Sequence, residues 1–231
     1  MAEAVFVIGG SRGIGRELVQ RLARRECPVV YASRQPAKAL PDVPWLPCDV
    51  RQPDQLATAF TVAEALLPAL DVVVFNAAVA PTGLLVGLSE ATIDEVLDVN
   101  MRAVLASVRA AEILFARLQR VGRLVLVGSV AATGMDGAVL YAASKAALRG
   151  LLNAQAGHWL RLSLVELGLV TGGLAEQTAL AEPFMPGGRC LSLVEAAQAI
   201  EAAFELPLEG CSRASGGMLE LPLWSAMRKG S

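Results

Sequence analysis

Short apolar runs alternate with helix-forming stretches along the whole of this 231-residue chain. The apolar runs predict strands at Val5–Ile8, Val29–Ala32, Trp45–Leu46, Val72–Phe75, Leu124–Val127, Leu162–Leu167 and Met218–Leu221. The stretches between them predict helices over Ile14–Arg25, Pro53–Leu67, Val139–Leu160 and Leu193–Phe204, with one or two more between Ser89 and Leu118. Such alternation predicts an α/β fold, a doubly wound parallel sheet with helices on both faces in three layers. No linker or repeat interrupts the pattern, so we expect a single domain over residues 1–231.

The longest connection in this pattern precedes the last helix. It spans residues 172–192 and contains two prolines and two pairs of adjacent glycines. Long loops in compact domains are commonly functional, so we predict a substrate loop over residues 172–192, with an ordinary surface connection as the alternative. Phe184, Met185 and Leu191 make this loop apolar enough to meet an acyl chain or a ring.

Composition excludes several classes of function. The net charge of −2 provides no basic field for nucleic acid. No apolar run reaches the roughly 18 residues that a membrane span needs, and the N-terminus begins with a strand pattern, so we expect a cytoplasmic protein with no membrane partner. The four cysteines form no CxxC pair and His158 is the only histidine, so we predict no metal site.

A glycine-rich turn follows the first predicted strand and opens the first predicted helix. It reads Gly9-Gly10-Ser11-Arg12-Gly13-Ile14-Gly15. Glycines permit a tight turn and a close approach of the backbone to a pyrophosphate, and the N-terminus of the helix offers free N–H groups to the anion. The turn therefore predicts dinucleotide binding, with a purely structural turn as the alternative.

Tyr141 and Lys145 lie four residues apart in the helix predicted from Val139. Residues at this spacing share one face of a helix, so both side chains can reach one substrate. A nearby ammonium group favours the phenolate, and we therefore expect Lys145 to lower the pKa of Tyr141. The pair predicts proton transfer; an exposed tyrosine beside a surface lysine is the alternative.

These motifs resemble those of the short-chain dehydrogenase/reductase family. The glycine turn is similar to the family's TGxxxGxG, with Ile8 in place of threonine, and Tyr141 and Lys145 match its YxxxK. Asn76-Ala77-Ala78 is similar to the family's Asn-Ala-Gly, and Asp49-Val50 to the pair whose acid contacts adenine. The resemblance covers nearly the whole chain and implies a Rossmann-type fold and a nicotinamide cofactor.

The same resemblance implies a catalytic set of Asn100, Ser129, Tyr141 and Lys145. By this resemblance, Tyr141 would donate the proton and Ser129 would hydrogen-bond the carbonyl oxygen. Lys145 would also hold the nicotinamide ribose. Asn100 would position a water that links Lys145 to solvent; a purely structural role is its alternative, and Thr133 is a fallback hydroxyl for Ser129. The family's Pro-Gly after the sixth strand reads Leu167-Gly168 here.

Charge at the end of the second predicted strand bears on the choice of cofactor. Family members that use NAD often end this strand with an acid, whereas this chain reads Tyr31-Ala32-Ser33-Arg34. Guanidinium groups suit phosphate, so Arg34 and Arg12 predict binding of the 2′-phosphate of NADPH, with solvated surface charges as the alternative. The full set of expected cofactor contacts is Gly9, Ser11, Arg12, Gly13, Ile14, Ser33, Arg34, Asp49, Val50, Asn76, Ala77, Ala78, Tyr141, Lys145, Val170 and Thr171.

The sequence thus predicts an NADPH-dependent ketoreductase similar to 3-oxoacyl-(acyl-carrier-protein) reductases. The expected substrate is a ketone, either free or bound to CoA or a carrier protein, such as a 3-oxoacyl thioester or a polyketide-like or cyclic ketone. Arg102 and Arg149 could meet an acidic carrier, although a solvated face is the preferred interpretation. Alanine-rich helices favour a homodimer or homotetramer. A nucleotide-sensing regulatory protein and an NAD-dependent alcohol dehydrogenase remain as alternatives.

Overall fold

The computed structural model describes residues 3–67, 69–154, 158–172, 174, 190–205 and 217–220. Its strands are β1 (Ala4–Ile8), β2 (Val29–Ser33), β3 (Trp45–Pro47), β4 (Leu70–Phe75), β5 (Gly122–Ser129), β6 (Leu160–Leu167) and β7 (Gly217–Glu220). Its α-helices are α1 (Gly13–Arg24), α2 (Pro53–Leu66), α3 (Glu90–Leu97), α4 (Ala103–Arg117), α5 (Val139–Ala154) and α6 (Leu193–Ala202). Short turns complete the order: the 3₁₀ turns η1 (Leu85–Gly87) and η3 (Val130–Thr133), and the π-helical turn η2 (Asp98–Arg102).

The strands form one parallel sheet in the order β3-β2-β1-β4-β5-β6-β7. The order reverses between β1 and β4, which are neighbours in the sheet. In doubly wound sheets ligands bind at this reversal, outside the carboxyl ends of the strands. The predicted doubly wound parallel sheet is therefore confirmed, and its reversal lies directly beside the glycine turn that follows Ile8.

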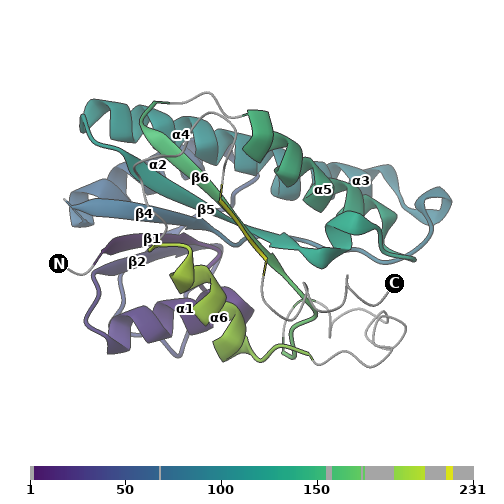
Figure 1. The fold of residues 1–231 in the computed structure, drawn as a ribbon, viewed down its shortest axis with the longest axis horizontal. Helices are drawn as coiled ribbons and strands as arrows, with labels where there is room; N and C mark the ends of the chain where they lie inside the picture. Colours follow the sequence, from purple (N-terminus) through teal and green to yellow (C-terminus); the bar gives the residue numbers. More distant parts are fainter. Residues whose placement is uncertain are drawn as a thin grey trace.

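Helices cover both faces of the sheet, with α2, α4 and α5 on one side and α1 and α6 on the other (Figure 1). Alternate residues of β1 serve the two sides: Phe6 and Ile8 pack toward the first group of helices, and Val5 and Val7 toward the second. Central strands are buried on both faces, so their sequences are continuous apolar runs. Their positions could therefore be predicted from the sequence.

One predicted helix is too long. The pattern from Val139 predicts a helix to Leu160, whereas α5 ends at Ala154 and β6 already begins at Leu160. The backbone N–H groups of His158 and Trp159 donate to the Glu112 carboxylate at 3.1 Å, which holds these two residues directly before β6.

The predicted helical region between Ser89 and Leu118 is two helices joined by η2, which holds Asn100. Ser89 caps α3 by accepting the Thr92 N–H at 3.2 Å. Within the described residues, no helix is both long and apolar enough to cross a bilayer.

Candidate active site

The glycine turn lies tightly against the end of β4. Gly9 has a φ of +90°, and a Cβ there would come within 2.7 Å of the Ala77 backbone nitrogen. A Cβ on Gly15 would come within 2.1 Å of the Gly9 carbonyl oxygen. Asn76 Nδ2 donates to that same oxygen at 2.9 Å. Only glycine satisfies this packing, and Asn76 holds the turn in place.

The N-terminus of α1 follows this turn and faces the strand ends. Arg12 occupies the N-cap position with extended backbone angles, and its side chain makes no capping hydrogen bond. The first-turn N–H groups of a helix without a side-chain cap are available to an anion, and the macrodipole favours negative charge there. The turn and α1 together therefore fit a pyrophosphate group.

Ser129, Tyr141 and Lys145 come together from two elements. Ser129 ends β5, and the other two residues lie one turn apart on α5. Lys145 is buried, its Nζ donates to the Val127 carbonyl oxygen at 2.8 Å, and it lies 5.7 Å from the centre of the Tyr141 ring. A hydrogen bond joins the Tyr141 and Ser129 side chains. The geometry can therefore present two hydroxyl groups and one cation to a carbonyl oxygen.

The protonation of this group differs from the expectation drawn from the sequence. Burial raises the pKa of Tyr141 above its ordinary value, and the hydrogen bond with Ser129 offsets this only in part. Burial also lowers the pKa of Lys145 to about 8. The expected lowering of the Tyr141 pKa by Lys145 is therefore wrong for this structure, because the loss of solvent around the phenol outweighs other effects. At neutral pH Tyr141 is a protonated phenol, which is the form that can donate a proton.

Asn100 lies beside this group but does not line the cavity. Its Oδ1 accepts the Val79 N–H at 3.0 Å, and its Nδ2 donates to the Val79 carbonyl oxygen at 2.8 Å and to Ser144 Oγ at 3.0 Å. The side chain thereby ties the segment after β4 to α5 through η2. These bonds fit the structural alternative for its side chain.

Positive side chains gather at the end of β2, where the sequence predicts the 2′-phosphate site. Arg12 and Arg34 are exposed residues on the cavity wall, and no ion pair involving either is seen in the described part of the chain. The Ser33 hydroxyl donates to the Gln35 carbonyl oxygen at 2.7 Å and accepts from Trp45 Nε1 at 3.0 Å, so it is already engaged.

Arg51 is a cavity residue that the sequence interpretation missed. Its Nε and Nη2 contact the two oxygens of Asp49 at 3.0 and 2.5 Å, and Nη1 lies 3.8 Å from Glu95. The hydrogen bonds from Arg51, with a further contribution from Arg34, hold the pKa of Asp49 below its usual value. Because Arg51 offsets the charge of Asp49, this end of the cavity remains favourable to an anion. Asp49 and Arg51 are close in sequence, but only the fold brings them to the cavity wall with Arg34 and Glu95.

A single cavity of about 1040 Å³ connects these features. Its lining includes nearly all of the predicted site: Gly9, Ser11, Arg12, Gly13, Ile14, Ser33, Arg34, Asp49, Val50, Asn76, Ala77, Ala78, Ser129, Tyr141, Lys145 and Val170. Thr171 and Asn100 are not among the lining residues. Thr133 does line the cavity, but its hydroxyl donates to the Val130 carbonyl oxygen at 2.9 Å. The volume and the two chemically different ends fit an extended dinucleotide together with a small substrate.

The segment beyond β6 is only partly described. Val170 pairs with Leu191 as an isolated parallel bridge, and the Thr171 N–H donates to the Leu191 carbonyl oxygen at 2.9 Å. Most of the predicted substrate loop over residues 172–192, including Phe184 and Met185, lies outside the described residues.

Two arginines considered for carrier binding have partners in the structure. Arg102 pairs with Asp98 on the surface. Arg149 is half-buried and makes a two-point contact with Glu166, a buried residue of the cavity wall. The solvated-face interpretation is therefore wrong for Arg149. Glu166 was not among the predicted residues, because the partner of a carboxylate inside an apolar strand pattern is evident only once the strand is placed against α5.

Known proteins share both the sequence pattern and the fold. The family model of short chain dehydrogenases matches residues 3–185. Carbonyl reductase family member 4 of Danio rerio is 31% identical over 224 residues, which cover 90% of this chain and 93% of that protein. The 3-oxoacyl-(acyl-carrier-protein) reductase MabA of Mycobacterium avium is 33% identical over 154 residues, covering 65% of this chain and 59% of that protein. The solved TT0495 protein from Thermus thermophilus has a TM-score of 0.76 at 30% identity, covering 88% of this chain and 91% of that one. The chain belongs to the short-chain dehydrogenase/reductase family of oxidoreductases.

Proposed function

We propose that this protein is an NADPH-dependent carbonyl reductase that reduces a ketone to an alcohol. The observation that carries the proposal is one cavity that joins a proton-donating end to a cationic, phosphate-binding end. Ser129, Tyr141 and Lys145 line one end, and the glycine turn lines the other together with Arg12 and Arg34. A nicotinamide dinucleotide fits both the close backbone approach at Gly9 and the cationic rim.

Bound NADPH would supply a hydride to the carbonyl carbon. Ser129 would donate a hydrogen bond to the carbonyl oxygen and orient it, as hydrogen-bond donors do in oxyanion sites. Tyr141, a neutral phenol at pH 7, would give its proton to the oxygen as negative charge develops there. The buried ammonium of Lys145 would then stabilise the phenolate that remains. Hydride and proton together complete the alcohol.

The preference for NADPH follows from the charges near the adenosine end of the cavity. Arg34 follows the last residue of β2, where an acid would favour the hydroxyl groups of NAD. Asp49, a carboxylate on this wall, is paired with Arg51. A 2′-phosphate would therefore meet guanidinium groups and a neutralised carboxylate, and guanidinium binds phosphate with two parallel hydrogen bonds.

The substrate class we propose is a 3-oxoacyl thioester or a polyketide-like or cyclic ketone. Two relatives support this substrate class: one is named a carbonyl reductase and the other a 3-oxoacyl-(acyl-carrier-protein) reductase. A homodimer or homotetramer through α4 and α5 is a further part of the proposal. Leu105 and Ile113 are apolar residues of α4 that are 51% and 58% exposed in the single chain, and a second copy could cover them.

The test is consumption of NADPH and of NADH with a panel of 3-oxoacyl thioesters, cyclic ketones and diketones. We expect turnover with NADPH that the Tyr141→Phe variant loses while it still binds the cofactor. Full activity in that variant would refute the assigned proton donor. Tight NADPH binding without turnover across the panel would instead favour the nucleotide-sensing alternative.

A further inference from the structure

Asp49 and Arg51 form a two-point ion pair on the cavity wall, close to Arg34. Arg51 Nε donates to Asp49 Oδ1 at 3.0 Å, and Nη2 donates to Oδ2 at 2.5 Å. Arg51 Nη1 also lies 3.8 Å from Glu95 Oε1 on α3. The guanidinium group of Arg51 therefore stands between two carboxylates, and all three side chains belong to residues that line the cavity.

The position of Asp49 does not depend on the Arg51 side chain alone. Asp49 Oδ1 also accepts the backbone N–H of Arg51 at 3.1 Å. The Asp49 carbonyl oxygen accepts the Gln52 N–H at 2.9 Å, and the Asp49 N–H donates to Gln55 Oε1 at 2.8 Å. A side chain without a charge at position 51 would keep these three hydrogen bonds. It would therefore leave the carboxylate in place on the wall without its cation.

Arg34 is a second cation that acts on Asp49. β2 and β3 are paired up to their last residues, and the Cys48 N–H donates to the Ser33 carbonyl oxygen at 3.0 Å. Arg34 and Asp49 therefore follow neighbouring strands at the same edge of the sheet. The hydrogen bonds from Arg51 chiefly lower the pKa of Asp49, and the charge of Arg34 lowers it further. Arg34 is exposed and makes no ion pair among the residues that the structure describes, so its guanidinium group is available to an anion.

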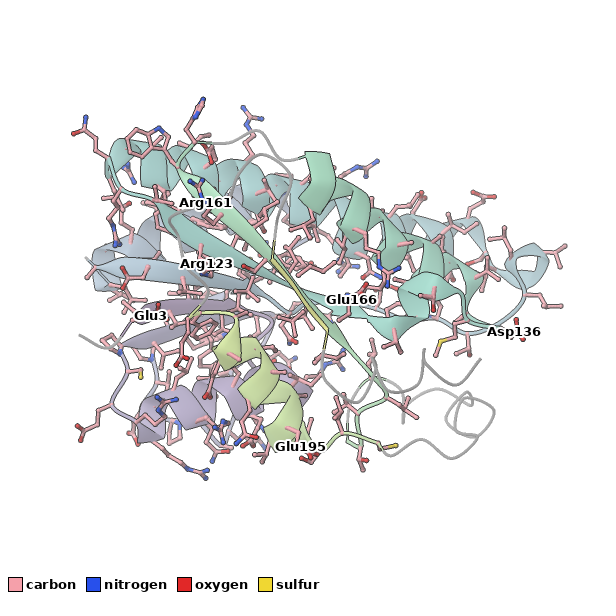
Figure 2. All side chains as sticks on the ribbon, in the orientation of Figure 1. Glu3, Arg123, Asp136, Arg161, Glu166 and Glu195 are labelled. Carbon is pink, nitrogen blue, oxygen red and sulfur yellow. The ribbon has the colours of Figure 1, made fainter. Side chains whose placement is uncertain are left out.

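The cavity wall carries both signs of charge. The charged residues that line it are Arg12, Arg16, Arg34, Asp49, Arg51, Glu95, Lys145 and Glu166. Glu166 lies beside Gly128 at the catalytic end. Figure 2 shows Arg123 and Arg161 toward the opposite end of the sheet from Glu166, and neither lines the cavity. Among the described lining residues, the acids outside the catalytic end are thus Asp49 and Glu95.

Asp98 is a further acid that acts on Arg51. The hydrogen bond with Asp49 chiefly raises the pKa of Arg51, and the charges of Glu95 and Asp98 add to this effect. Asp98 is paired with Arg102 on the surface and does not line the cavity. Asp49 is therefore the acid on this wall that loss of the Arg51 charge would affect most.

We propose that Arg51 is a specificity-determining residue that favours NADPH without contacting the 2′-phosphate, because it occupies Asp49 and so leaves Arg34 free to bind the phosphate. The inference rests on the proposed function, which assigns the 2′-phosphate to Arg34. Without Arg51, the Asp49 carboxylate would attract the Arg34 guanidinium and would also oppose the phosphate. An arginine after β2 would then be insufficient for a preference for NADPH.

Binding of two adenosine fragments tests this proposal without nicotinamide or ketone. Adenosine 2′,5′-bisphosphate carries the 2′-phosphate, and adenosine 5′-monophosphate lacks it. Calorimetry measures the affinity of each variant for both fragments, and the ratio of the two affinities isolates the contribution of the 2′-phosphate. A loss of adenine contact would lower both affinities and cancel in this ratio. The result therefore stands whether or not a ketone substrate is found.

Arg51→Met should lower the affinity ratio about three- to tenfold, the effect of one charge at a partly exposed site. Asp49→Asn removes the acid that competes for Arg34. The double variant Arg51→Met/Asp49→Asn should therefore recover most of the wild-type ratio. Loss of packing at Arg51 would not produce this recovery, because the second substitution restores no contact.

Arg21→Met is the matched control. Arg21 donates to both oxygens of Glu201, at 2.8 and 3.3 Å, and neither residue lines the cavity. The same substitution there also leaves a carboxylate without its arginine, and it should leave the affinity ratio unchanged.

An unchanged ratio in Arg51→Met would overturn the proposal. An equal loss in the Asp49→Asn background would overturn it as well, because Arg51 would then contact the phosphate directly. A wild type with no preference for the bisphosphate would refute the 2′-phosphate site at Arg34 and this proposal together. If Arg51→Met fails to fold, the decision rests on Asp49→Asn and the double variant: similar ratios support the proposal, and a lower ratio in the double variant refutes it.

Discussion

Replacing Gly15 by alanine would place a methyl group where the glycine turn leaves no room. The added Cβ would lie 2.1 Å from the Gly9 carbonyl oxygen and 2.5 Å from Asn76 Nδ2, whereas ordinary contacts begin at 3.4 Å. The turn would therefore have to move away from α1 by about 1.3 Å, the difference between 3.4 and 2.1 Å. Such a movement would break the hydrogen bond from Asn76 to Gly9, now 2.9 Å long.

The energetic cost can be estimated from these contacts. Overpacking costs about 1–3 kcal/mol, and the lost hydrogen bond adds about 1 kcal/mol. Alanine gains about 0.5–1 kcal/mol over glycine inside a helix, which leaves a net loss of about 1–3 kcal/mol. For a chain of this length the melting temperature should fall by about 2–12 °C. NADPH affinity should fall as well, because the displaced turn is the proposed phosphate site.

Gly150→Ala is the matched control for this substitution. Gly150 lies within α5, is exposed, and has no atom within 4 Å of the position of an added Cβ. The same change should therefore stabilise the protein by about 0.5–1 kcal/mol. Thermal unfolding and NADPH fluorescence titration measure both variants. A Gly15→Ala protein with the melting temperature and NADPH affinity of the wild type would refute the close packing of this turn.

Three further predictions concern charge and capping. The pKa of Lys145 is about 8 in the folded protein, against an ordinary value of 10.5. Between these two pH values the unfolded chain binds more protons than the folded one. The free energy of unfolding should therefore rise with pH in this range, by up to about 3 kcal/mol. Lys145→Met should show a smaller gain in melting temperature from pH 8 to pH 10 than the wild type, and an equal gain would contradict the buried ammonium. Ser192→Ala should cost about 1 kcal/mol in urea unfolding, because it removes the capping box that Ser192 forms with Glu195 at the start of α6; a midpoint unchanged from the wild type would argue against this cap. Arg34→Ala should weaken NADPH binding much more than NADH binding in fluorescence titrations, and equal losses would remove the argument for a 2′-phosphate site.

The central strands and the cavity residues could be predicted because their patterns are local. A strand buried on both faces needs apolar residues throughout, so β1 and β4 could be predicted from their apolar runs. The glycine turn and the Tyr141–Lys145 spacing each fall within seven residues. The end of α5 was not predictable in this way, because Glu112, far away in the chain, fixes the start of β6.

Features of the site that depend on strand placement or burial could not be predicted from the sequence. The pairing of Glu166 with Arg149 requires the register of β5 and β6 and the seat of α5. The pKa of Tyr141 rises because of burial, a property that residue spacing alone does not report. Asp49 and Arg51 are close in sequence, yet the placement of both on the cavity wall beside Arg34 follows from the positions of β2 and β3.

The burial of Lys145 itself carries a consequence for the proposed reaction. Its ammonium donates to the neutral carbonyl of Val127, and no ion pair of Lys145 with a carboxylate is seen within the described ranges. A buried cation without an anion costs free energy in the resting protein. The cost falls when negative charge appears on Tyr141 or on the carbonyl oxygen, so the interaction is stronger in the transition state than before it. The fold thus keeps the positive charge available for the anion that the reaction creates.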